Sequence, residues 1–467
     1  MGEVKSRRSG ILLHITSLPG GHGIGDLGPA ARRQADWMHK AGLDIWQVLP
    51  ITPIGEGNSP YSGRSTFAME PLLLSLDDLH TAGLLPRSAL RCDASLRSGP
   101  TKYVSARRFK SPRITAAFDA FAAKGRLRSR GFTRFLSENA SWLPDWCDDQ
   151  RGEPDEHAFI QFMLERQWKR LRTYAATRGI GFIGDVPIFV HADSTDVRRR
   201  PELFRLDRRG EPTVVSGVPP DDFCKDGQRW GHPHYRWAAH RREHFAWWID
   251  RFRLALDRFD AVRVDHFIGF VRLYEVASTA KTARRGVWRR TPGRELLEVL
   301  QRELGSLPLI AEDLGEVTPA VRRLRDDFNL PGMRIAQWGF FRDGSPDLPQ
   351  NHPRRCVCYP GTHDNDTVRS WYRGLSPDAK VRFQDITGCR RGADAAWAMI
   401  DACMDAPAEC CIIPMQDVLN LGAAARMNRP GTPRGNWRWR MDGHAGAALA
   451  RRMRTTTARR SPMLPRP

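Results

Sequence analysis

Residues 259–267 form an apolar run that is interrupted by charge and ends in a carboxylate. Read as a β-strand, this run places Arg263 and Asp265 on one face, and Val262 and Val264 on the other. An arginine two residues away lowers the pKa of an aspartate and keeps its carboxylate ionised. The segment therefore predicts a strand that packs against helices on one face and prepares a nucleophilic carboxylate on the other.

Two later segments repeat this pattern. Residues 307–315 run from apolar side chains to Glu312, and residues 355–366 pass through a Pro-Gly turn to Asp364. Successive acids are about 50 residues apart, which leaves room for helices between the strands. Barrels of alternating strands and helices carry their chemistry at the carboxyl ends of the strands. We therefore predict an α/β protein, a (β/α)8 TIM barrel, whose rim gathers these two acids and Asp265.

The length of 467 residues permits two to four domains, or one barrel with insertions. The repeated strand pattern favours one catalytic barrel over residues 1–445. Two segments, about 70–150 and 187–235, are predicted to be insertions over the carboxyl rim. Residues 446–467 are basic and rich in threonine, and we predict that they form a disordered tail.

The net charge of +20 is compatible with a nucleic-acid partner, but the basic residues are scattered and no known binding module accompanies them. We therefore expect a solvated basic surface and no nucleic-acid partner. No apolar run reaches the roughly 18 residues of a membrane span, and the charged N-terminus is not a signal peptide. Nine cysteines without a Cys-X-X-Cys pair fit reduced thiols in the cytoplasm.

Two segments carry side chains suited to sugar recognition. A loop rich in Pro and Gly follows the predicted strand 45–49 and holds Ser59 and Tyr61, whose ring can cover the C–H face of a sugar. The alternative is a turn in which Tyr61 is simply packed. The long excursion over 187–235 carries Gln228 and Trp230. We interpret this excursion as a lid that excludes water while an acceptor sugar enters.

Ten stretches, taken in order between Gly10 and about Trp439, make the chain resemble the amylomaltases, the 4-α-glucanotransferases of glycoside hydrolase family 77 in the α-amylase clan. They read LHITSLPG (13–20), WQVLP (46–50), NSPY (58–61), GDVPIF (184–189), GVPPD (217–221), GQRWG (227–231), RVDH (263–266), AEDLG (311–315), GTHDN (361–365) and ARMN (425–428). The resemblance covers nearly the whole chain.

The resemblance implies a role for each acid. Asp265 is expected to be the nucleophile, Glu312 the general acid and then base, and Asp364 the residue that orients the sugar and stabilises the transition state. The next acid, Asp313, points off the face of Glu312 in a strand. The expected substrate contacts are Ser59, Tyr61, Asp185, Gln228, Trp230, Arg263, His266, Trp338, His363 and Asn428. For Asp185, the alternative is a structural aspartate that satisfies loop amides.

This chemistry needs no metal and no cofactor, because covalent and acid–base catalysis suffice. The implied activity is transfer of α-1,4-glucan segments among glucans and malto-oligosaccharides. An α-glucan hydrolase of the same clan and a catalytically silent glucan-binding protein are the alternatives.

Four positions depart from the family pattern. Asp222 stands where the lid usually has an aromatic residue, and Glu70, Arg198 and Trp338 replace other frequent residues.

Overall fold

The computed structural model describes residues 7–220 and 224–460. Eight parallel strands pair in the order β10-β11-β12-β1-β2-β3-β6-β9. The amide of Ala311 in the last of these donates to the carbonyl of Pro331, just before β10, at 2.9 Å and joins the two ends of the sheet. The predicted (β/α)8 barrel is confirmed. Its strands are β1 Arg8–Leu12, β2 Ile45–Gln47, β3 Gly181–Val186, β6 Ala261–Val264, β9 Leu309–Ala311, β10 Gly332–Ile335, β11 Cys356–Tyr359 and β12 Cys410–Pro414.

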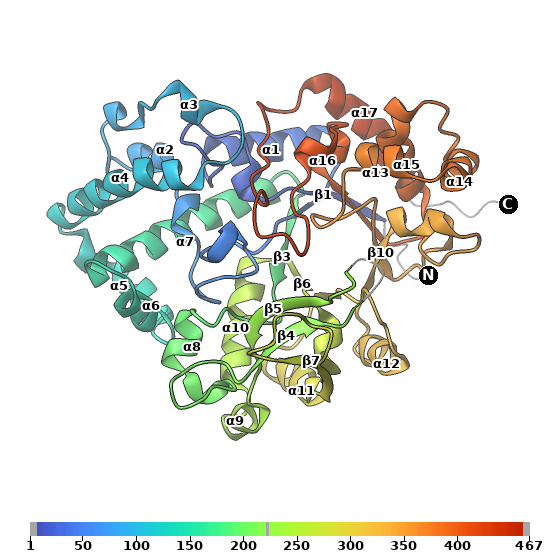
Figure 1. Cartoon of the computed structure of the whole chain (residues 1–467). Coiled ribbons are helices and arrows are strands. Elements are labelled where there is room, and N and C mark those ends of the chain that lie inside the picture. Colours follow the sequence, from blue (N-terminus) through green and yellow to red (C-terminus); the bar gives the residue numbers. More distant parts are fainter. Residues whose placement is uncertain (1–6, 221–223, 461–467) are drawn as a thin grey trace, which may run out of the picture.

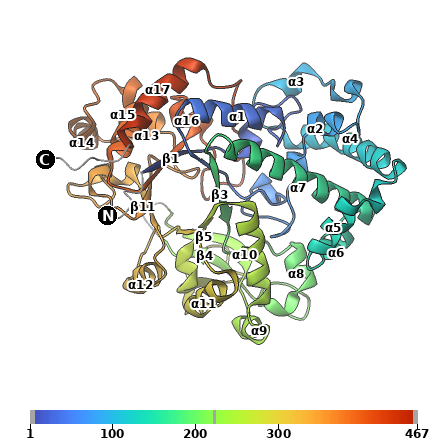
Figure 2. The same ribbon diagram turned by 180° about the vertical axis from the view of Figure 1, so that it is seen from behind.

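Helices surround this barrel (Figures 1 and 2). Local signals set their ends: Pro319 opens α12, and the Thr318 hydroxyl accepts from the amide of Val321. Gly42, with φ of 72°, follows α1. The helices that precede or follow the barrel strands are α1 Pro29–Lys40, α7 Pro154–Ala176, α9 Trp237–Arg242, α10 Ala246–Arg258, α11 Gly293–Leu304, α12 Pro319–Asp327, α13 Val368–Gly374, α14 Pro377–Thr387, α15 Ala395–Asp405 and α16 Met415–Val418.

The strands divide their side chains between two cores, as period-two alternation requires. Val262 and Val264 of β6 belong to the large core between the strands and the helices. Side chains such as Met333 and Ile412 pack together inside the barrel. Arg263 lies on the opposite face of β6, toward the barrel interior, where its guanidinium pairs with Asp185. The predicted division of the two faces of residues 259–267 is therefore confirmed.

Residues 70–150, which the sequence predicts to be an insertion, form several helices. Figures 1 and 2 show its helices extending to one side of the barrel, beyond α7. Phe121 and Phe132 of the insertion pack against Phe159 and Phe162 of α7, with ring centroids 5.0 to 6.0 Å apart. The helices are α2 Leu76–Thr81, α3 Ala94–Arg97, α4 Tyr103–Ala123, α5 Arg130–Glu138 and α6 Leu143–Asp149.

The excursion over 187–235 holds the helix α8 Thr195–Arg199 and two strands, β4 Val214–Val218 and β5 Gln228–Pro233. These strands join β7 Arg272–Ala277 and β8 Val287–Arg290 in an antiparallel sheet, in the order β5-β4-β7-β8. We call this the small sheet. Its strands come from two separate segments of the chain, so the sequence of the excursion alone does not reveal it.

The prediction of a disordered tail from residue 446 is wrong for residues 447–460. Helix α17 Ala447–Thr457 continues into a short turn that ends at Arg460, which is 2% exposed. The Arg460 guanidinium donates to the carbonyls of Cys403 and Met404, at 3.3 and 3.2 Å, near the end of α15. Carbonyls in the last turn of a helix have incomplete backbone partners, and a basic side chain can donate to them. The Cys403 carbonyl also accepts from the Ala406 amide at 3.3 Å. Residues 461–467 lie outside the described residues.

Across residues 7–220 and 224–460, no helix combines the length and apolar character that crossing a membrane requires.

Candidate active site

Arg263 gathers three carboxylates at the carboxyl end of the barrel. Its Nη1 donates to both oxygens of Asp185 at 2.8 Å, and its Nη2 lies 3.0 Å from Asp265 and 3.7 Å from Glu312. The Arg263 side chain is only 4% exposed, whereas those of Asp265 and Glu312 are 27% and 17% exposed. A buried cation thus holds two reachable carboxylates close to one another.

Glu312 is adapted to carry a proton near neutrality. Burial raises its pKa from 4.5 to about 8. Asp265 and Asp364 add to the rise through their negative charge, while Arg263 and a hydrogen bond from the His266 amide oppose it. The carboxyl group is therefore protonated at neutral pH, as a general acid must be.

The loop after β11 fixes the third acid. The Asp364 carboxylate accepts from Asn428 Nδ2 at 2.6 Å and lies 3.5 Å from His363 Nε2. Its backbone carbonyl accepts from Arg426 Nη2 at 2.8 Å, and its amide donates to Thr362 Oγ1 at 3.3 Å. The Asp364 side chain is 45% exposed despite these contacts. It is oriented by its neighbours and still free to meet a ligand.

An aromatic cluster forms another wall of the site. The ring of Tyr61 stacks on His363 at 5.1 Å, and Trp437 lies 5.7 Å from Tyr61 and 5.8 Å from His363. The Tyr61 hydroxyl donates to Asp185 at 2.7 Å. Tyr103, at the start of α4, donates to the Trp437 carbonyl at 2.7 Å. The helical insertion therefore helps to position this wall.

The small sheet brings β5 to the same site. The Trp230 ring lies 4.9 Å from that of His266, edge to face, and its indole donates to Gln228 Oε1 at 3.3 Å. Burial lowers the pKa of His266 to about 4, so its ring is neutral. Its Nε2 is buried and has no hydrogen-bond partner among the described residues. A ligand hydroxyl can supply that partner.

Two expected contacts are not joined to the carboxylates in the structure. The Ser59 hydroxyl accepts from the Tyr61 amide at 3.3 Å, so it shapes the loop that carries Tyr61. Trp338 is half-buried in the turn Ala336–Phe341 that follows β10. Sugar contact by these two side chains stays a prediction.

The departures from the family pattern have local explanations. The buried Glu70 carboxylate accepts from the amides of Ile54 and Leu72, at 2.9 and 3.0 Å, and so holds a turn. Arg198 pairs with Asp149 and Asp193 at the surface. Asp222 lies outside the described residues.

Sequence reasoning did not select Trp437, Arg426 and Phe189. Trp437 has a φ of 62°, and its amide donates to Met427, which folds the segment back over the site. Phe189 lies 6.4 Å from the His266 ring. The ARMN and GDVPIF stretches contain Arg426 and Phe189, so resemblance offered a signal for these two. Nothing in the sequence around Trp437 indicated such a fold-back.

Together these side chains can perform acid–base and nucleophilic chemistry on a sugar. They offer a carboxylate beside a cation, a protonated carboxyl group and a wall of rings. Within the part of the chain that the structure describes, no group of three or more His, Cys, Asp or Glu side chains is arranged to hold a metal ion.

Comparison with known proteins decides the family. Residues 13–149 and 145–445 match the model of glycoside hydrolase family 77, described as 4-alpha-glucanotransferase. The chain belongs to this family.

Other family 77 proteins resemble the chain over nearly its whole length. The 4-alpha-glucanotransferases of Thermus thermophilus and Synechocystis sp. are 41% and 40% identical to it. The alignments cover 93% of the chain in both cases, and 95% and 94% of the two relatives. A solved structure of amylomaltase from Streptococcus agalactiae in complex with acarbose superposes with a TM-score of 0.91 at 32% identity, covering 97% of this chain and 99% of that one.

The raised pKa of Glu312 predicts an alkaline limit to activity in this family 77 protein. If Glu312 is the general acid, the first chemical step needs its protonated form, which is lost as the pH rises through about 8. We expect kcat/KM for a malto-oligosaccharide to fall by about tenfold per pH unit above that value. Initial rates of glucose release between pH 5 and 10 measure this. A profile that stays flat to pH 10 would contradict the assignment of Glu312 as the acid.

Proposed function

We propose that the protein is a 4-α-glucanotransferase that cleaves α-1,4-glucosidic bonds and transfers the released segment to a second glucan or to glucose. The observation that carries this proposal is the contact of both Asp265 and Glu312 with Nη2 of Arg263. Retaining enzymes hold their two carboxyl groups about 5–5.5 Å apart, and inverting enzymes leave room for a water between them. Because Asp265 and Glu312 both approach Nη2 of Arg263, their carboxyl groups lie close together, which favours the retaining arrangement.

In the first step, Asp265 attacks the anomeric carbon of the donor while Glu312 gives its proton to the departing glycosidic oxygen. A carbon–oxygen bond forms to Asp265 as the glycosidic bond breaks, and the shorter glucan leaves with a new hydroxyl group. Arg263 stabilises the Asp265 carboxylate before the attack. Its second pair, with Asp185, fixes the orientation of the guanidinium.

In the second step, Glu312 is a carboxylate and takes the proton of an acceptor hydroxyl, whose oxygen attacks the same carbon and releases Asp265. Asp364 faces the sugar ring and stabilises the positive charge that develops on it in each transition state. His363 and Asn428 hold Asp364 in place. Their side-chain N–H groups can also donate to hydroxyl groups of a sugar bound at Asp364.

Transfer prevails over hydrolysis when an acceptor sugar reaches the covalent intermediate before water does. Trp230 and Gln228 of β5 lie beside His266, where they can pack against an acceptor and exclude water. The names of the family 77 relatives, which are 4-alpha-glucanotransferases, also favour transfer over the hydrolase alternative.

Incubation with maltotriose tests this proposal. We expect glucose together with a ladder of longer malto-oligosaccharides, because each released segment is passed to another chain. Hydrolysis gives only glucose and maltose, and a silent binding protein gives no product. Chromatography of the product mixture at early times separates these outcomes. Formation of shorter products alone would replace the transferase assignment with the hydrolase.

The proposal includes a cytoplasmic location and no nucleic-acid partner. The nine cysteines, among which the sequence has no Cys-X-X-Cys pair, fit a reducing compartment. The scattered positive charge fits a solvated surface, since arginines form many of the surface ion pairs.

A further inference from the structure

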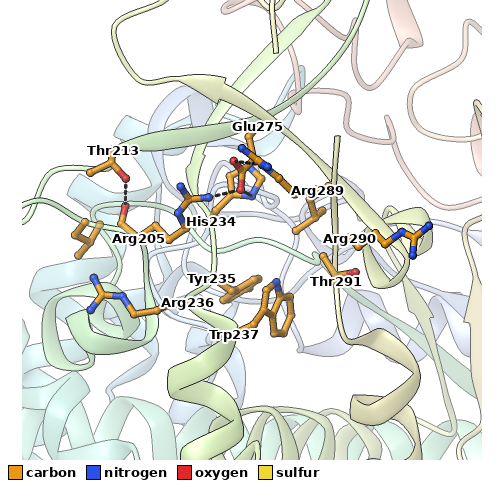
Figure 3. Close-up of a pocket in the computed structure, with 12 residues that line it drawn as sticks. Arg205, Thr213, His234, Tyr235, Arg236, Trp237, Glu275, Arg289, Arg290 and Thr291 are labelled. Carbon is orange, nitrogen blue, oxygen red and sulfur yellow. Dashed lines mark hydrogen bonds and ion pairs between the residues drawn. The ribbon is translucent and has the colours of Figure 1, made fainter. Parts of the chain in front are cut away.

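A cavity of about 390 Å³ lies against the small sheet (Figure 3). Its walls come from the segment around Arg205, the start of α9, and the strands β7 and β8. Volumes of about 300–1,000 Å³ are typical of small-molecule sites. None of the catalytic carboxylates or sugar contacts named above lines this cavity.

The centre of the cavity is a carboxylate held by two guanidinium groups. Glu275 pairs with Arg205 Nη1 and lies 3.4 Å from Arg289 Nε. Figure 3 shows both arginines converging on Glu275. Each uses one nitrogen for this pair, so further N–H groups of both guanidiniums remain to donate to a ligand. The Glu275 side chain is 10% exposed and offers little to a sugar hydroxyl.

The remaining charge of the cavity is positive. Arg236 and Arg290 lie at opposite sides of it in Figure 3, and their exposed side chains have no polar partner among the described residues. Burial lowers the pKa of His234 to about 4, and Arg205 adds to this, so the imidazole is neutral near pH 7. Two guanidinium groups therefore pair with the one carboxylate, and those of Arg236 and Arg290 lie at the edges of the cavity, directed away from it.

Part of the cavity is apolar. Leu206, Leu273, Tyr235 and Trp237 contribute to its lining. Trp237 is half-buried and can cover a carbon skeleton, as flat rings do at sugar and nucleotide sites. A ligand that fills this cavity therefore has one anionic end and one carbon-rich end.

We propose that this cavity binds a small phosphate monoester, with its phosphate between Arg205 and Arg289 and its carbon skeleton against Trp237. Arginine forks suit phosphate because two parallel N–H groups match two phosphate oxygens. A neutral glucan is a poorer match, because its hydroxyl groups need acceptors as well as donors and the one carboxylate is already paired. Arg236 and Arg290, being unpaired, can swing inward to complete the neutralisation.

Isothermal titration with glucose 6-phosphate, inorganic phosphate and glucose, at a fixed ionic strength of about 0.15 M, tests this site. We expect saturable binding of glucose 6-phosphate that weakens by about tenfold or more in Arg289→Ala. Arg285→Ala is the matched control. It removes the same charge from the loop between β7 and β8, where Arg285 is exposed and does not line the cavity. Binding in this control should equal that of the wild type.

A second variant predicts an effect of opposite sign. Glu275→Gln removes the negative charge that competes for Arg205 and Arg289, so glucose 6-phosphate should bind more tightly. Equal binding of inorganic phosphate and glucose 6-phosphate would identify free phosphate as the ligand. The proposal fails if glucose 6-phosphate shows no saturable binding at millimolar concentrations. It fails as well if Arg289→Ala and the control Arg285→Ala weaken that binding equally. It also fails if Arg289→Ala weakens glucose binding as much as glucose 6-phosphate binding.

Discussion

Glu312→Gln is expected to reduce turnover of maltotriose by at least about 10³-fold, because both chemical steps of the proposed mechanism pass a proton through this side chain. Glutamine keeps the shape of the protonated acid but has no proton to give to the departing oxygen. It also has no carboxylate to accept one from the acceptor. Initial rates of glucose release at pH 7 measure the effect. Turnover within tenfold of the wild type would remove Glu312 from the mechanism.

A matched control and a stability measurement separate lost chemistry from lost structure. Glu316→Gln, in the same loop and 67% exposed at its side chain, should leave turnover unchanged. The folded-state pKa of Glu312 is raised from 4.5 to about 8. The stability this group contributes is therefore complete below about pH 4.5 and lost as the pH rises through 8. Glutamine stays neutral, so the variant should melt at a higher temperature than the wild type at pH 9.

The three acids could be predicted from the sequence because their positions follow from strand geometry alone. A period of two separates the faces of β6, and the carboxyl ends of parallel strands meet at one rim. The same logic excluded Asp313. In the structure its carboxylate is paired with Arg325 and accepts from the amide of Met333 at 2.8 Å, away from Glu312.

Features that depend on segments far apart in the chain could not be predicted. Trp437 reaches the site only because the chain after β12 folds back over the rim and Tyr103 of the insertion holds its carbonyl. The small sheet combines strands from both sides of β6. Arg460 reads as part of a solvated basic tail, yet it satisfies carbonyls near the end of α15. Local patterns carry no information about such partners.

Arg263 should matter to both stability and catalysis, since it contacts three carboxylates while being only 4% exposed. Arg263→Gln leaves the buried Asp185 and the partly exposed Asp265 without their cation. Removing one partner of a buried ion pair typically costs about 3–5 kcal/mol, and we expect a loss of that size in urea unfolding. Turnover should fall by more than about 100-fold, because Asp265, the proposed nucleophile, loses the guanidinium that lies 3.0 Å from its carboxylate and orients it.

The double variant Asp185→Asn with Arg263→Gln separates the two roles of the arginine. Removing the Asp185 charge as well relieves the uncompensated negative charge, so much of the lost stability should return. Activity should not return, because Asp265 still lacks its cation. Arg263→Lys should be intermediate in stability but still poorly active, since an ammonium cannot fork to Asp185 while contacting Asp265. If the double variant regains turnover together with stability, Arg263 acts only as a structural residue. Another group in the site must then stabilise and orient the Asp265 carboxylate for attack.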